Sequence, residues 1–82
     1  MKNKRGFIRV SDVIMWDYEV MTKVYSVFYP FHIEYKHWMN YFEIYGVCDD
    51  FDEIKEGDVV KQYEFTLTRK EDDSLDIKCS KV

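Results

Sequence analysis

Alanine is absent from the sequence, and leucine occurs only twice. Because these two residues are among the strongest helix formers, their scarcity argues against a helical bundle. In their place stand nine valines, six isoleucines and fifteen aromatic residues, which suit the pleated surface of a sheet. The composition therefore predicts an all-β domain.

Signals of a chemical site are also missing. The two cysteines, Cys48 and Cys79, are too few for a disulfide framework and lack metal-ligand spacing, so we expect reduced thiols packed as small hydrophobic groups. The two histidines, His32 and His37, are predicted to point to opposite faces of a strand and not to share a metal. The sequence contains no Gly-rich phosphate loop, HExxH motif or nucleophile spacing. We therefore expect no enzyme, cofactor or metal site.

Long apolar runs are absent as well. No run approaches the ~18 residues that a membrane-spanning helix needs, and the basic start at 1–5 is not followed by the apolar region of a secretory signal. We therefore expect a cytoplasmic protein without a membrane partner. The 82 residues predict one domain over 1–82 with a basic, flexible N-terminal arm at 1–6. A domain of this size is marginally stable alone, so a partner or a dimer is expected to add stability.

A first hairpin is predicted in the middle of the chain. Residues 31–36 and 42–48 alternate between apolar and polar side chains and are separated by a short turn. Pro30 cannot donate to a strand ladder, which indicates a bend or a sheet edge. Gly46 is a candidate β-bulge.

Further strands are predicted on either side of this hairpin. Residues 59–68 and 75–80 alternate around a polar loop and form the clearest hairpin, and residues 6–10 are a candidate first strand. Five to six strands with short connections indicate a small antiparallel sheet, a sandwich or a partly open barrel.

The segment 14–24 is ambiguous. Its even positions are mostly apolar and its residues are mainly β-branched or aromatic, which favours a long strand. The alternative is a helix at about 12–28 with Ser11 as its N-cap, which would make the fold α+β.

Charge and aromatic residues are concentrated in different halves. Residues 49–82 carry a net charge of −5, whereas residues 1–48 carry +1 and contain 12 of the 15 aromatic residues. Because a small two-layer fold cannot bury all of these rings, some are expected in an interface. The candidate protein-binding residues are aromatic or apolar side chains at the hairpin tip and acids in the loop that follows: Trp38, Met39, Tyr41, Asp49, Asp50, Asp52 and Glu53.

These features predict a small acidic protein that acts stoichiometrically on a protein partner as an inhibitor or adaptor. The amino-acid usage is typical of A/T-biased genes, which are common in phages and mobile elements. One alternative is a small-barrel protein that binds single-stranded nucleic acid by aromatic stacking, although the net charge of −4 disfavours it. The other alternative is a structural homodimer.

Overall fold

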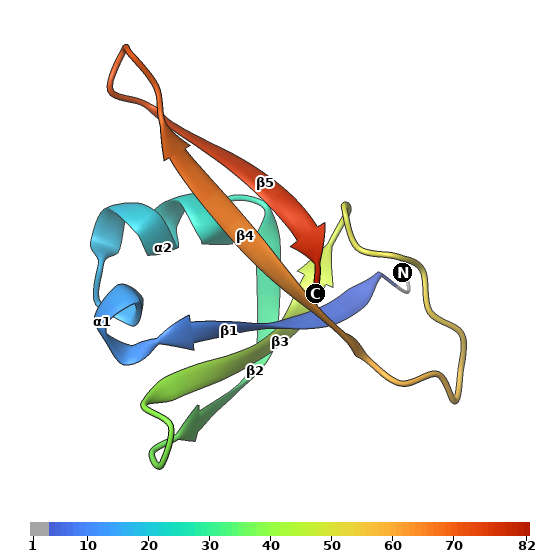
Figure 1. Cartoon of the computed structure of the whole chain (residues 1–82). Helices are drawn as coiled ribbons and strands as arrows, with labels where there is room; N and C mark the ends of the chain where they lie inside the picture. The colour runs from blue at the N-terminus through green and yellow to red at the C-terminus, as the bar shows by residue number, and fades with distance from the viewer. Residues whose placement is uncertain (1–3) are drawn as a thin grey trace.

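The computed structural model describes residues 4–82, which form a five-stranded sheet with two short helices on one side (Figure 1). Strands account for 51% of the structure, so the predicted sheet-dominated class is confirmed. The elements, in chain order, are β1 (Arg5–Ser11), α1 (Asp12–Met15), α2 (Tyr18–Tyr25), β2 (Phe28–Lys36), β3 (Tyr41–Cys48), β4 (Lys61–Arg69) and β5 (Leu75–Lys81).

The sheet has the strand order β2-β3-β1-β4-β5. The two predicted hairpins, β2–β3 and β4–β5, are present, and β1 pairs antiparallel with β3. In contrast, β1 and β4 are parallel and pair only over Gly6–Ile8. The sheet is therefore mixed instead of wholly antiparallel, because the long connection at 49–60 returns the chain in the direction of β1.

The strand predicted at 14–24 is wrong, and the helical alternative is found as α1 and α2. Two side-chain caps explain this outcome. The Ser11 hydroxyl accepts the N–H of Ile14 at 3.2 Å, and the Asp17 carboxylate accepts the N–H of Val20 at 3.2 Å. Each cap satisfies a backbone donor that a helix start would leave unpaired, which offsets the weak helix propensity of the β-branched residues.

Helix α2 packs through residues three apart in the sequence. Met21 and Val24 are buried, with 5% and 3% of their surface exposed. Trp16 and Tyr18, which the strand interpretation placed in the same alternating row as Val24, are instead 79% and 85% exposed. The helical period therefore selects a different buried face from the one that period-two alternation selects.

The core lies between the helices and the sheet. Phe28 and Ile44 have no exposed surface, and aromatic rings meet around Phe28, whose centroid lies 5.8 Å from that of Phe51 and 5.9 Å from that of Phe65. The buried cluster consists of Ile8, Val10, Met21, Val24, Phe28, Ile44, Cys48, Phe51 and Tyr63.

Both cysteines are free thiols, as predicted. Cys48 is buried in the core, and Cys79 is half-buried on β5. Burial raises the pKa of the Cys48 thiol and raises the pKa of Cys79 to about 11. Both side chains are thus held as neutral thiols and pack as small hydrophobic groups.

Strand β2 is an edge strand, which agrees with the indication from Pro30. The bulge, however, lies between Pro30 and His32 of β2 and not at Gly46. Gly46 serves a different purpose, because a Cβ at this position would overlap the Tyr29 carbonyl oxygen and the Phe28 ring. The glycine therefore permits close approach of β2 to β3.

Residues 1–3 of the predicted basic arm lie outside the described residues. Arg5 and Gly6 belong to β1, where they pair with Val47 and Gly46 of β3. Lys4 donates from its ammonium group to the Asp49 carbonyl oxygen at 3.1 Å. The described part of this segment is thus joined to the sheet.

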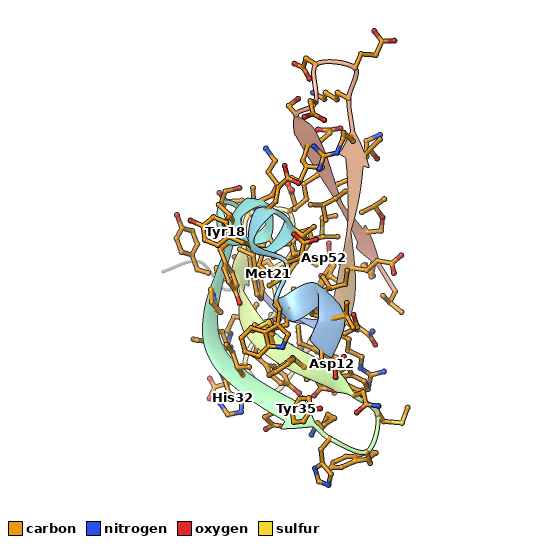
Figure 2. The ribbon with its side chains drawn as sticks, turned by 90° about the vertical axis from the view of Figure 1, so that its left-hand side faces the viewer. Asp12, Tyr18, Met21, His32, Tyr35 and Asp52 are labelled. Carbon is orange, nitrogen blue, oxygen red and sulfur yellow. The ribbon has the colours of Figure 1, made fainter. Side chains whose placement is uncertain are left out.

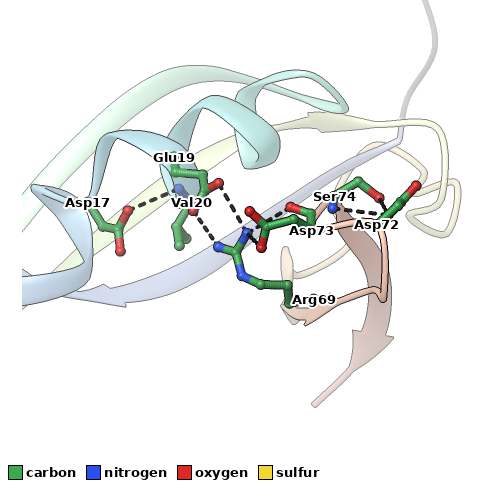
Figure 3. A network of polar contacts seen from close by, with 7 residues as sticks. All are labelled: Asp17, Glu19, Val20, Arg69, Asp72, Asp73 and Ser74. Atoms are coloured by element: carbon green, nitrogen blue, oxygen red, sulfur yellow. Dashed lines mark hydrogen bonds and ion pairs between the residues drawn. The ribbon is translucent and has the colours of Figure 1, made fainter.

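The far end of the β4–β5 hairpin is connected to α2 by Arg69 (Figure 3). The Arg69 guanidinium forms an ion pair with Glu19 of α2 and donates to the carbonyl oxygen and carboxylate of Asp73 at 2.8 and 3.1 Å. Asp73 has a φ of 70°, and the neighbouring Ser74 bonds to Asp72, so the tight turn is fixed by its own side chains. This network holds the protruding hairpin against the helical layer.

Candidate protein-binding surface

Exposed apolar side chains are concentrated in one part of the chain. Of the twelve large hydrophobic side chains that are exposed within residues 4–82, ten fall between residues 13 and 39. All ten come from the helical segment, from β2 and from the turn after β2, but Tyr29 follows the buried Phe28 on β2 and therefore points to the other face of the sheet. The other nine form one group. We call them the apolar surface: Val13, Ile14, Trp16, Tyr18, Phe31, Ile33, Tyr35, Trp38 and Met39.

A backbone hydrogen bond brings α1 next to the β2–β3 turn. The N–H of Asp12 donates to the carbonyl oxygen of Asn40 at 3.1 Å. Figure 2 shows the result: α1, with Asp12, lies at the same end of the hairpin as Tyr35. The apolar residues of α1 and those at the end of β2 therefore belong to one region of the molecule.

The register of the hairpin decides which β2 side chains face the helices. Ile33 pairs with the buried Ile44, and Tyr35 pairs with Phe42, whose ring centroid is 4.7 Å away. Both β2 side chains thus lie on the core side of the sheet. They remain 46% and 45% exposed, because the helices do not extend over this edge.

The predicted residues at the hairpin tip differ in exposure. Trp38 and Met39 are 65% and 60% exposed, in keeping with their predicted position at a turn, and the Lys36 ammonium lies 5.6 Å from the Trp38 ring centroid. Tyr41 is half-buried, and the Arg9 guanidinium lies 5.1 Å from its ring centroid. Of the three residues, only Trp38 and Met39 are therefore largely exposed.

The face of the sheet that the helices leave open carries a polar cluster around Glu43. This carboxylate is 7% exposed, accepts the Tyr45 hydroxyl at 2.7 Å and accepts the Arg9 Nε–H at 3.4 Å. The sheet places both partners next to Glu43. Arg9 is directly opposite Glu43 on β1, and Tyr45 is two residues further along β3, on the same face. The hydrogen bond to Glu43 is the main reason that the pKa of Tyr45 rises to about 12.

This cluster predicts an unusual tyrosine titration. The folded-state pKa of Tyr45, about 12, lies above its ordinary value of 10.0, so the Tyr45–Glu43 bond stabilises the fold below pH 10 and is lost as the pH rises through 12. We expect the tyrosinate absorbance of the wild type to contain a late component that Tyr45→Phe removes. Glu43→Gln should move that component toward ordinary values. A wild-type titration identical in range to that of Glu43→Gln would contradict the assignment.

A second charged row lies on β2 beside this cluster. The Glu34 carboxylate accepts from the Lys36 ammonium at 2.7 Å and bonds to the His32 ring at 2.9 Å. The Lys36 hydrogen bond is the largest cause of a lowered pKa at Glu34. Because the three residues alternate with Ile33 and Tyr35, β2 has one charged face and one apolar face.

The predicted acidic residues lie at the other end of β3 from the hairpin tip. Asp49, Asp50, Asp52 and Glu53 follow Cys48, whereas Trp38 and Met39 precede Tyr41. All four acids are exposed. The two groups of predicted site residues therefore do not form one surface.

Asp52 has a structural partner on each of two strands. Its carboxylate lies 3.6 Å from the Lys61 ammonium of β4 and forms a second ion pair with Lys81 of β5. The hydrogen bond from Lys81 is the main cause of a lowered pKa at Asp52. Asp52 thus joins the loop to the sheet, which leaves Asp50 and Glu53 better placed to meet a partner.

The acidic loop at 49–60 also contributes side chains to the core. Its acidic composition does not indicate this. Phe51 and Ile54 are 2% and 3% exposed. Phe51 stacks on Tyr63 with ring centroids 4.0 Å apart, and the Tyr63 hydroxyl accepts the backbone N–H of Asp52 at 2.9 Å. The loop is therefore anchored and not merely solvated.

Of the nine residues of the apolar surface, sequence reasoning named only Trp38 and Met39 as site residues. Ile14, Trp16 and Tyr18 were assigned to a strand over 14–24, but they and Val13 lie on or between two short helices. Ser11 was the available sequence signal of a helix start, because serine is a preferred N-cap residue. In the structure its hydroxyl accepts the N–H of Ile14. Asp17, which caps α2, was a second such signal, because aspartate is also a preferred N-cap residue.

Comparison with known proteins does not provide a function. No protein-family model, curated protein or solved structure matches this chain. Within residues 4–82, no cluster of three or more His, Cys, Asp or Glu side chains is arranged to hold a metal ion. None of the helices in that range has the length and apolar character needed to cross a bilayer.

Proposed function

We propose that this protein is a binding protein that acts stoichiometrically on a protein partner, as an inhibitor or adaptor, through the apolar surface. The observation that carries the proposal is the exposure of four large aromatic side chains, Trp16 (79%), Tyr18 (85%), Phe31 (60%) and Trp38 (65%), in a region where the Asp12–Asn40 hydrogen bond joins α1 to the β2–β3 turn. Contiguous exposed apolar residues on a small domain mark interaction sites, because their burial removes apolar area from water.

The composition of the surface also fits an interface. Tryptophan, tyrosine, phenylalanine and methionine are enriched at the centres of protein interfaces, and tryptophan is prominent among the residues whose truncation costs most affinity. Trp16 and Trp38 come from two elements that the Asp12–Asn40 hydrogen bond holds together. We therefore assign them as the two anchors of the interface.

The acidic charge has a separate role in this proposal. The net charge is −4, and Asp50 and Glu53 are exposed at the other end of β3 from the anchors. Charges outside an interface core mainly change the rate of encounter. The partner is accordingly expected to present a basic surface, with an association rate that falls as salt is added.

The open face of the sheet offers less support for binding single-stranded nucleic acid. Phe7 and Tyr45 supply aromatic rings there, 5.2 Å apart, but two of the cations on this face are already in ion pairs. Arg9 is paired with Glu43, and Lys36 is paired with Glu34. A phosphate backbone would meet carboxylates on this face, which is unfavourable.

The test is truncation of one anchor in the purified complex. With a partner captured from the cells that make the protein and shown by light scattering to bind in a fixed ratio, we expect Trp16→Ala to weaken binding about 30-fold, equivalent to ~2 kcal/mol. Trp38→Ala should behave similarly. Val59→Ala is the control, because Val59 is 84% exposed but lies outside the apolar surface.

Two results separate the role of the apolar surface from that of the acids. If both tryptophan variants bind as tightly as the wild type, the apolar surface is not the interface. Reversing the charge of Asp50 and Glu53 should slow association at low salt and leave the dissociation rate unchanged. A large increase in the dissociation rate would place the acidic loop within the interface instead.

A further inference from the structure

The two edges of the sheet differ in how they are protected. Strand β5 alternates apolar residues with polar or charged ones, and it carries Lys78 and Lys81 on an outer strand, which is a common defence against edge-to-edge pairing. Strand β2 carries Pro30 and a bulge in its first half only. Residues 32–36 of β2 pair regularly with β3 on one side, and within residues 4–82 no strand lies on their other side.

The sequence of this open half is self-complementary when two copies are placed antiparallel. A two-fold axis at Ile33 puts Ile33 opposite Ile33 of the second copy. It also puts His32 opposite Glu34 of the second copy, and Glu34 opposite its His32, on the charged face. Opposite-charge and hydrogen-bonding pairs across strands stabilise a sheet.

The apolar residues also meet in the same arrangement. On either side of the central Ile33 pair, Tyr35 of one copy comes next to Phe31 of the other, which is the extra residue of the bulge between Pro30 and His32. Ile33, Tyr35 and Phe31 are 46%, 45% and 60% exposed in the single chain. Cross-strand aromatic pairs add to the stability of such a ladder.

Neighbouring registers are less favourable. An axis at Glu34 places two carboxylates directly opposite each other, and an axis at His32 leaves Glu34 opposite Pro30. An axis at Tyr35 restores a Glu34–Lys36 pair, but beyond its three pairs the strand ends at Lys36, whereas the three regular pairs about Ile33 are continued on each side by Tyr35 and Lys36 against Phe31 and Pro30. Directly opposed like charges destabilise strand pairs, so the charge pattern selects the axis at Ile33.

We propose that the β2 edge binds a second copy of this chain, with β2 strands antiparallel about Ile33, so that two sheets join into one. This inference rests on the proposed function, since it identifies a partner for part of the apolar surface. Pro30 falls at the end of the ladder, opposite Lys36, where its missing N–H disrupts no interior pair. The contact uses the same patch on both copies and therefore closes as a dimer.

The register is tested by disulfide formation. In a Cys79→Ser background, Ile33→Cys should form a covalent dimer under mild oxidation at least tenfold faster than Glu34→Cys. Residues directly opposite each other have Cβ atoms ~5 Å apart, whereas the diagonal neighbours are ~7 Å apart. Cys48 is buried and common to both variants. Comparable rates for the two variants, or faster dimer formation by Glu34→Cys, would overturn the register.

A charge swap tests the same register without new cysteines. By light scattering, the wild type should have the mass of a dimer, and Glu34→Lys should weaken the dimer about tenfold. His32→Glu combined with Glu34→Lys should restore it, because the exchanged charges again face each other only when the axis is at Ile33. Glu64→Lys, on an exposed position of β4, is the matched control.

The outcomes distinguish this inference from the proposed function. A wild type that stays monomeric at all concentrations, while Trp16→Ala still loses its captured partner, would overturn the dimer and leave the protein-binding function intact. A dimer that forms as described, while both tryptophan variants retain the partner, would support the inference and contradict the proposed anchors.

Discussion

Phe28→Ala is expected to unfold much of the protein at room temperature. Phe28 has no exposed surface, and its ring contacts Phe51 and Phe65 at the centre of the core. Truncating a buried phenylalanine removes its transfer energy and leaves a cavity, at a cost of about 3–5 kcal/mol. Native domains have a total stability of only ~5–15 kcal/mol, so the loss is a large share of the whole.

The matched control lies on the same strand. Tyr29 is 70% exposed and belongs neither to the apolar surface nor to the proposed β2 ladder, so Tyr29→Ala should change the free energy of unfolding by less than about 0.5 kcal/mol. Urea unfolding followed by circular dichroism measures both variants. If the two substitutions destabilise the protein equally, the assignment of Phe28 to the core and Tyr29 to the surface is wrong.

Phe51→Ala should be nearly as damaging, although Phe51 lies in an acidic loop. Its ring is 2% exposed and stacks on Tyr63, so its removal is expected to cost about 3 kcal/mol or more. The loss should also free the chain around Asp52, whose N–H is held by the Tyr63 hydroxyl. Amide exchange at Asp52 should therefore accelerate more than expected from the change in global stability.

Glu53→Ala is the control for this second prediction, because Glu53 is exposed in the same loop. Its urea unfolding midpoint should match that of the wild type. Phe51→Ala with an unchanged midpoint would mean that residues 49–60 are a solvated loop, as the acidic composition indicates, and that the aromatic stack does not anchor them.

Both hairpins were predictable because their determinants are local. The alternation of Tyr63, Phe65 and Leu67 with polar residues, and the turn signal before Leu75, are contained within a short segment. The sheet edge at β2 was likewise indicated by Pro30. These features depend on neighbouring residues and need no knowledge of the rest of the fold.

The helical segment was not predictable from periodicity, because its residues satisfy two periods at once. Val20 and Val24 belong to an alternating row and also to a helical stripe with Met21. The decision depends on the caps at Ser11 and Asp17 and on packing against the sheet. The latter is a tertiary effect that propensity does not contain.

The parallel pairing of β1 with β4 was also outside local reasoning. The pair joins Gly6–Ile8 to residues 61–63, and it requires the whole intervening chain to be placed first. To predict this pair correctly, one would have had to know that Phe51 is buried, because its burial directs the connection across the end of the sheet. The acidic neighbours of Phe51 conceal that burial.

The sequence indicated the kinds of residue in the candidate site better than it indicated where in the structure those residues lie. An excess of aromatic residues over what a small core can bury correctly indicated exposed rings, and Trp38 and Met39 are among them. Tyr41 is half-buried with its ring against Arg9, and Asp52 forms ion pairs with two lysines. Face and pairing depend on strand register, which the composition does not specify.

Amide hydrogen exchange of the protein, with and without its captured partner, tests the role of the apolar surface most directly. It requires no substitution and reports on each segment separately. We predict that partner binding slows exchange in residues 13–18 and 37–39 and leaves residues 49–60 and the β4–β5 hairpin unchanged. Slower exchange confined to residues 49–60, with residues 13–39 unaffected, would contradict the proposed interface and place it at the acidic loop.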